Sequence, residues 1–127
     1  MMSAKQVDLD RLAVALTDYD FAYVISVSDH YHAHTATVDP VFEDGLLRIG
    51  PIGRHTRTNV DAHRDVTVLW PPRTAGGYSL IVDGHAESLD PLVVRPTRAV
   101  LHRPATEDSA PASCSPAYDC VDFVAQT

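Results

Sequence analysis

Lysine, cysteine and long apolar runs are scarce in this chain. Lys5 is the sole lysine among 127 residues, arginine supplies the other nine basic side chains, and the formal net charge is -7. Binding to a nucleic-acid backbone depends on basic side chains that replace its counterions, so this charge argues against a nucleic-acid partner. Any anion that the protein binds must be held by a local group of arginines, whose planar guanidinium suits bidentate contacts.

Only two cysteines are present, Cys114 and Cys120, and no second pair completes a zinc site. We assign them no function; free thiols are expected in a reducing compartment, with a disulfide between them as the alternative. No apolar run reaches the length of a signal-peptide core or a membrane span. The sequence therefore predicts a cytoplasmic protein without a membrane partner.

The composition, 45% hydrophobic and 21% charged, is ordinary for one globular domain with a core. A change to Ser, Ala and Pro after Pro104 suggests a boundary, with a folded domain over residues 1–104 and a tail over residues 105–127. Apolar residues return near the end of that tail, at Tyr118, Val121, Phe123 and Val124. We expect the tail to dock on the domain or on a partner subunit.

Runs of aromatic and β-branched residues predict six strands, most of them antiparallel, at residues 21–28, 32–38, 46–50, 66–70, 78–89 and 93–102. Two short helices are predicted at residues 9–16, with Asp8 as the cap, and at about 56–63. Gly84 is expected to form a bulge, and Pro96 to lie at an edge or a bend. Six strands in so short a chain favour a closed barrel, because closure removes unpaired edges.

The junction between the third strand and the second helix carries the strongest functional pattern. Gly50 and Gly53 precede Arg54, His55 and Thr56, where a helix presents its unpaired N–H groups. Guanidinium, hydroxyl and the positive end of the helix dipole all favour an anion, so this junction predicts a phosphate site. A surface turn with solvated arginines is an equally good explanation of this segment alone.

The chain resembles the pyridoxamine 5′-phosphate oxidase-like family of flavin-binding split barrels from about Phe21 to Pro104. The segments that carry this resemblance are His34–Val38, Asp44–Gly50, Gly53–Val60, Val66–Trp70 and Val82–Glu87. The resemblance implies a mainly β fold with two short helices, a six-stranded antiparallel split β-barrel. It also implies a homodimer that binds FMN between its subunits and acts as an oxidoreductase on a small substrate.

The resemblance further implies a set of cofactor-binding residues. Arg54, His55 and Thr56 correspond to the triplet that holds the flavin phosphate. The remaining expected contacts are His34, Thr35, Ala36 and Thr37 beside the ring and phosphate, Ile49 and Gly50 through their backbone, and Ser79 from the other subunit. No catalytic residue is predicted, because the flavin itself carries the redox chemistry.

Two departures from the family pattern bear on the substrate. His34 and Asp39 stand where the oxidases of the family have an arginine and a lysine, and Thr56 stands where they have a lysine. Their substrate-recognising C-terminal segment has no counterpart in residues 105–127. We therefore do not expect pyridoxamine phosphate as the substrate, and the deazaflavin F420 remains an alternative to FMN.

Two further alternatives come from the seven histidines and from the missing cations. His30, His32 and His34 alternate, so on a strand they would share one face and could bind a metal, and split barrels that bind haem through histidine make haem a third cofactor candidate. The sequence predicts no complete metal site, because a further ligand is not evident. A small barrel without enzymatic activity is the remaining alternative.

Overall fold

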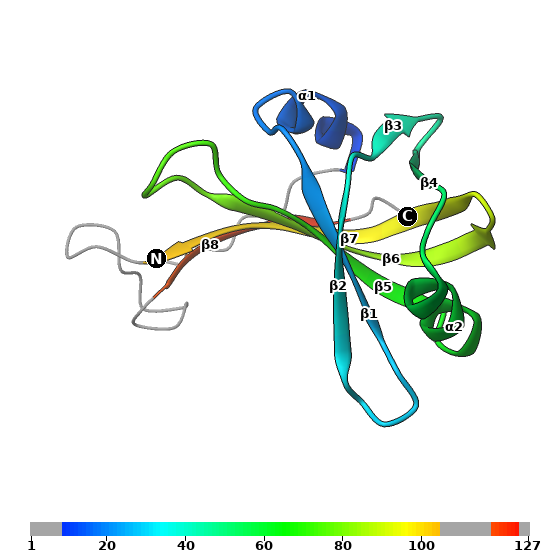
Figure 1. Ribbon diagram of the computed structural model, residues 1–127. Helices are drawn as coiled ribbons and strands as arrows, with labels where there is room; N and C mark the ends of the chain where they lie inside the picture. The colour runs from blue at the N-terminus through cyan, green and yellow to red at the C-terminus, as the bar shows by residue number, and fades with distance from the viewer. Residues whose placement is uncertain (1–8, 105–117, 125–127) are drawn as a thin grey trace.

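A computed structural model describes residues 9–104 and 118–124 of the chain (Figure 1). It contains a short 3₁₀ helix, two α-helices and eight strands. In chain order they are η1 (Leu9–Arg11), α1 (Leu12–Leu16), β1 (Ala22–Val27), β2 (Ala33–Val38), β3 (Val41–Glu43), β4 (Leu46–Gly50), α2 (Arg54–Ala62), β5 (Asp65–Trp70), β6 (Ser79–Leu89), β7 (Leu92–Pro104) and β8 (Tyr118–Val124).

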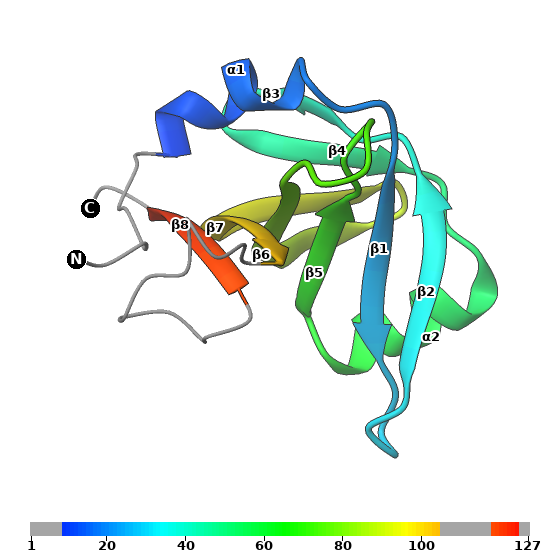
Figure 2. The same cartoon turned by 90° about the vertical axis from the view of Figure 1, so that its left-hand side faces the viewer.

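All strand pairs are antiparallel, and they form one sheet in the order β2-β1-β5-β6-β7-β4-β3. The long β7 pairs with β6 along one edge, and its other edge is shared between β4 and β8. The end strands β2 and β3 are joined by Asp39 and Pro40, so the curled sheet comes back on itself as a barrel (Figure 2). The predicted mainly β, antiparallel barrel class is confirmed.

The strand count differs from the predicted six because β3 and β8 were not expected. β3 has three residues, too few to show an alternating pattern, and it exists as the partner of β4 across the Asp44-Gly45 turn. Both turn residues have positive φ angles, 55° and 76°, which suits a two-residue hairpin loop. β8 lies within the predicted tail and pairs with the second half of β7.

The core fills the inside of the barrel because alternate residues of each strand point inward. In β1, Ala22, Val24 and Ser26 are buried, and the residues between them are partly exposed. The two helices lie at opposite ends of the barrel, α1 near β3 and α2 beside the β1–β2 hairpin (Figures 1 and 2). Leu12 fixes the α1 end, with 1% of its surface exposed. The Asp8 cap predicted for this helix lies outside the described residues.

The expected irregularities of β6 and β7 are both present. The register of this pair shifts between Asp83 and Gly84, which confirms the predicted bulge at Gly84. Gly84 faces Pro96, so the proline lies where the ladder is already interrupted and its missing N–H costs little.

Candidate functional site

The first turn of α2 is open to solvent on its outer side. Helix α2 begins at Arg54, two residues earlier than predicted, and Gly53 is its N-cap. Glycine has no side chain that could cap the helix, and no side-chain cap bond forms there. The first N–H groups of α2 therefore remain available to an anion, as expected from the sequence.

The predicted phosphate-binding triplet divides between two faces of this helix. Arg54 and His55 are exposed, whereas Thr56 has only 1% of its surface exposed and faces the barrel. Successive helical residues are rotated by about 100°, so three neighbours cannot share one face. The Thr56 hydroxyl forms no hydrogen bond within residues 9–104. Arg54 and His55 are thus the side chains of the triplet that meet solvent.

Strand β2 brings a second predicted residue to the same turn. The ring centroids of His34 on β2 and His55 on α2 lie 5.4 Å apart, with the ring planes inclined by 42°. His34 and Ala36 are half-buried on the side of β2 that faces the barrel. Thr35 and Thr37 alternate with them on the exposed side. The structure therefore joins His34 to the α2 turn and separates it from the two threonines.

The other predicted residues lie farther apart. Ile49 is buried, and Gly50, with φ of +91°, ends β4 beside Leu92 just before the α2 junction. Ser79 is the first residue of β6. Leu92, the partner of Gly50, pairs with Leu89 at the other end of β6. Ser79 and the α2 turn, which follows Gly50, therefore lie near opposite ends of that strand in one chain.

Charge at the α2 turn is concentrated in Arg54. Arg57, one turn later, has its guanidinium 3.7 Å from Asp90 and donates to the Ile52 carbonyl at 3.5 Å. Arg54 forms no ion pair with any residue in the described part of the chain. A guanidinium without a carboxylate partner among the described residues, at a helix start with free backbone N–H groups, is suited to bind an anion.

A buried polar contact fixes α2 against the barrel, and the sequence did not reveal it. Asn59 donates from Nδ2 to the Ser26 hydroxyl at 3.1 Å, and the two residues are 8% and 0% exposed. At the end of α2, His63 Nε2 lies 2.8 Å from the Asp29 carboxylate in the β1–β2 turn. The sequence signal for the first contact was weak, because an asparagine in a helix and a serine in a strand are each common at the surface.

Removing the Asn59 contact should weaken the packing of α2 on the barrel. We expect Asn59→Ala to lower the free energy of unfolding by about 1–2 kcal/mol, because Ser26 loses its buried partner. The control is the double variant Asn59→Ala with Ser26→Ala, which leaves no unpaired hydroxyl and should cost less than the sum of the two single changes. Urea unfolding of the four proteins measures the difference. Additive costs would contradict a direct coupling between the two residues.

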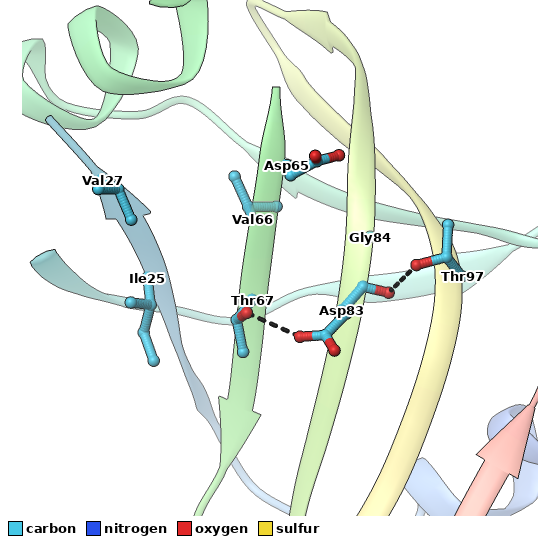
Figure 3. A pocket seen from close by; sticks show the side chains of 8 residues that line it. All are labelled: Ile25, Val27, Asp65, Val66, Thr67, Asp83, Gly84 and Thr97. Carbon is cyan, nitrogen blue, oxygen red and sulfur yellow. Dashed lines mark hydrogen bonds between the residues drawn. The ribbon is translucent and has the colours of Figure 1, made fainter. Parts of the chain in front are cut away.

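A shallow groove lies on the outer face of the sheet, across β1, β5, β6 and β7 (Figure 3). Its volume is about 380 Å³. Asp83 accepts two hydrogen bonds in this groove. The Thr67 hydroxyl donates to the Asp83 carboxylate at 2.8 Å, and the Thr97 hydroxyl donates to the Asp83 carbonyl at 3.1 Å. Neither Arg54 nor His55 lines this groove. It is lined by Ile25, Val27, Asp65, Val66, Thr67, Asp83, Gly84 and Thr97.

A second hollow of about 440 Å³ lies between α1 and the loop that joins β5 to β6. The Tyr19 hydroxyl donates to the Tyr78 carbonyl there at 2.9 Å. Burial raises the pKa of Tyr19 above its ordinary value, and the neighbouring Asp18 adds to this shift. Tyr19 therefore stays a neutral hydrogen-bond donor at neutral pH.

The alternating histidines do not share a strand face. β2 begins at Ala33, so His30 and His32 lie in the hairpin turn, where Tyr31 has a positive φ of 63°. The expectation that His30, His32 and His34 point to one side of a strand is therefore wrong. Residues 9–104 contain no group of three His, Cys, Asp or Glu side chains that could hold a metal ion.

No helix in the described ranges is long and apolar enough to cross a membrane.

Solved structures with a similar fold support the barrel assignment. An F420 reductase superposes with a TM-score of 0.55 at 16% sequence identity, over 65% of this chain and 91% of its own. HupZ of Group A Streptococcus superposes with a TM-score of 0.56 at 12% identity, over 72% of this chain and 91% of its own. Both are split barrels, and the chain has the split-barrel fold.

Sequence comparison gives closer relatives than these structures do. No protein-family model matches the sequence. The uncharacterized proteins Mb0449c of Mycobacterium bovis and MT0457 of Mycobacterium tuberculosis are each 44% identical to it over 139 aligned positions. The alignments cover 96% of this chain and 98% of each relative. Since this identity extends over nearly the whole of both proteins, the chain belongs to the same family as these two mycobacterial proteins.

Proposed function

We propose that this protein binds a phosphorylated flavin or deazaflavin and serves as an oxidoreductase of the pyridoxamine 5′-phosphate oxidase-like group. The observation that carries the proposal is the first turn of α2, an uncapped helix N-terminus. It carries Arg54, which has no ion pair within the described residues, and His55, whose ring contacts that of His34. These are donors for a phosphate group, and they come from β2 and α2, two elements that the split-barrel fold brings together.

The residues at the α2 turn fit such a cofactor because they offer hydrogen-bond donors to its phosphate. Arg54 would bind the phosphate oxygens through its guanidinium, and the backbone N–H groups after Gly53 would add the positive end of the helix dipole. The bound ring would supply hydride or electron transfer, so the chain itself needs to bind, orient and shield the cofactor. Thr56 would contribute its backbone N–H rather than its hydroxyl, because its side chain faces the barrel.

FMN is the first candidate, because the α2 turn resembles the phosphate-binding junction of the flavin-binding barrels. F420 is the second, and the specific observation in its favour is the fold similarity to an F420 reductase. The proposed substrate is a small molecule. The cytoplasmic location predicted from the sequence is part of the same proposal.

We also propose that two copies form the functional unit. The outer face of the sheet carries partly exposed apolar side chains on β1, β5 and β6, which a second copy could cover. A partner would also bring its own Ser79 toward the α2 turn, which Ser79 of the same chain does not approach. The apolar side chains of this face are Tyr23, Ile25, Val27, Leu69 and Ile81.

Side-by-side titration with FMN, F420 and haem tests the proposed function. We expect one of the two phosphorylated ligands, FMN or F420, to bind at micromolar concentration or below, with a fluorescence change on binding and a shift in its absorbance bands. Riboflavin, which lacks the phosphate, should bind at least tenfold more weakly than FMN if FMN is the ligand. Binding of haem alone, with a Soret band and no response to FMN or F420, would overturn the proposal.

A further inference from the structure

Four of the seven histidines fall into two kinds of surroundings. His63 lies 2.8 Å from the Asp29 carboxylate, and His85 lies 3.1 Å from the Asp65 carboxylate. His34 and His55 instead lie against each other, and neither forms an ion pair with any carboxylate of residues 9–104. A protonated imidazole at His63 or His85 already has a counter-charge, whereas one at His34 or His55 has none among the side chains that the structure describes.

Among the described residues, the elements that pack around His34 and His55 carry no carboxylate that is left without a partner. Strand β1 contributes the uncharged Ser26, and β2 carries no charged side chain besides His34, with His32 just before it in the turn. On α2, Arg54 adds positive charge, while Arg57 and Asp61 are paired with Asp90 and Arg64. The acidic residues of β6 are also paired, Asp83 with Arg98 and Glu87 with Arg95.

We propose that His34 and His55 make phosphate binding at the α2 turn proton-coupled, so that cofactor affinity rises as pH falls. This inference rests on the proposed function. Imidazoles titrate between about pH 5 and 8, and a bound phosphate supplies the counter-charge that both rings otherwise lack. Binding then takes up protons, and by linkage the affinity is highest where the imidazoles are protonated and is lost as pH rises.

The pH range for a test of this coupling depends on the phosphate of the ligand as well as on the imidazoles of the protein. A phosphate monoester loses its second proton near pH 6, so below that value its own charge falls and opposes the gain at the histidines. Between pH 6.5 and 8.5 the FMN phosphate stays largely a dianion, and the imidazoles account for the change. We expect FMN to bind about tenfold more tightly at pH 6.5 than at pH 8.5, equivalent to one charge-assisted contact.

Calorimetry and fluorescence titration of the full chain test this coupling. FMN and riboflavin are titrated at pH 6.5 and 8.5, and the FMN titration at pH 7.5 is repeated in two buffers with different heats of ionisation. We expect the FMN affinity to change about tenfold, the riboflavin affinity to stay constant within about twofold, and FMN binding to take up a measurable fraction of a proton. If F420 proves to be the ligand, F420 and its dephosphorylated deazaflavin replace the two flavins.

Variants test whether the imidazoles of His34 and His55 cause the pH dependence of FMN binding. His34→Gln and His55→Gln should each reduce proton uptake and flatten the pH dependence, whereas His63→Gln, at the C-cap of α2, should leave both unchanged. Circular dichroism checks that each variant is folded. Proton uptake by the natural chain tests the coupling independently of the variants. Tight phosphate-dependent binding with no proton uptake would overturn this inference and leave the proposed function standing. Failure of both FMN and F420 to bind at either pH would overturn both.

Discussion

Replacing Arg54 with alanine should weaken FMN binding by about 10- to 100-fold, because one charge-assisted contact to the phosphate is lost. Riboflavin binding should stay within about twofold of the natural protein, since no phosphate is present to contact the guanidinium. Arg54 is the side chain on which this expectation depends, because it is exposed and forms no ion pair within the described residues. Fluorescence titration with both flavins, or with F420 and its dephosphorylated form, measures the two affinities.

Arg64→Ala is the matched control, because Arg64 lies just beyond the other end of α2 and lies 3.9 Å from Asp61. It removes the same charge from the protein without touching the first turn, so FMN affinity should change by less than about twofold at physiological salt. Arg54→Lys should fall between the natural protein and Arg54→Ala, because lysine keeps the charge but loses the planar fork of donors. An equal loss in Arg54→Ala and Arg64→Ala would point to general electrostatics and place the phosphate elsewhere.

Most strands of the fold could be predicted from the sequence because each of them has a strong local pattern. β4 was predicted with its observed bounds, since Leu46–Gly50 lies between the Asp44-Gly45 turn and Pro51. β3 and β8 escaped prediction for a different reason. Each is a strand because of its partner, β4 for one and β7 for the other. β3 is too short to show a local pattern, and the local sequence of β8 does not reveal that it pairs with β7.

The start of α2 shows how a small error at an element boundary alters a site. The sequence placed the helix start near Thr56, which would make Arg54, His55 and Thr56 neighbours along a loop. With the helix beginning at Arg54, the same three residues follow helical rotation, and Thr56 turns into the barrel. The sequence correctly placed Gly50 and Gly53 just before a helix start, but which side chains face outward required the structure.

The contacts that hold the site together could not be predicted from the sequence alone. His34 and His55 are 21 positions apart and Ser26 and Asn59 are 33 positions apart, and neither pair has a spacing that a helix or a hairpin would explain. The family resemblance placed His34 and His55 in one site, but it did not reveal their ring contact. Ser26 and Asn59 belong to the support of the site, which depends on how α2 packs on β1.

Gly84→Ala should lower the free energy of unfolding by about 3 kcal/mol, near the upper end of the usual cost of overpacking a core. A Cβ atom at this position would overlap Val94 Cγ1 and lie 2.8 Å from the Arg95 carbonyl oxygen. Val94 is fully buried and β-branched, and the carbonyl belongs to the neighbouring strand, so neither group can move away easily. The φ angle of Gly84 is not positive, so the cost is steric.

Two companion variants separate this steric cost from a general effect of losing a glycine. Gly53→Ala should change stability by less than about 1 kcal/mol, because its φ is -75° and nothing lies within 4 Å of the added atom. Val94→Ala combined with Gly84→Ala should cost about 1 kcal/mol less than the sum of the single changes, since removing Cγ1 makes room for the new methyl group. The rescue stays partial because the Arg95 carbonyl remains 2.8 Å away. Denaturant unfolding of the set measures these differences, and equal stability of Gly84→Ala and Gly53→Ala would contradict the close approach of β6 and β7 at the bulge.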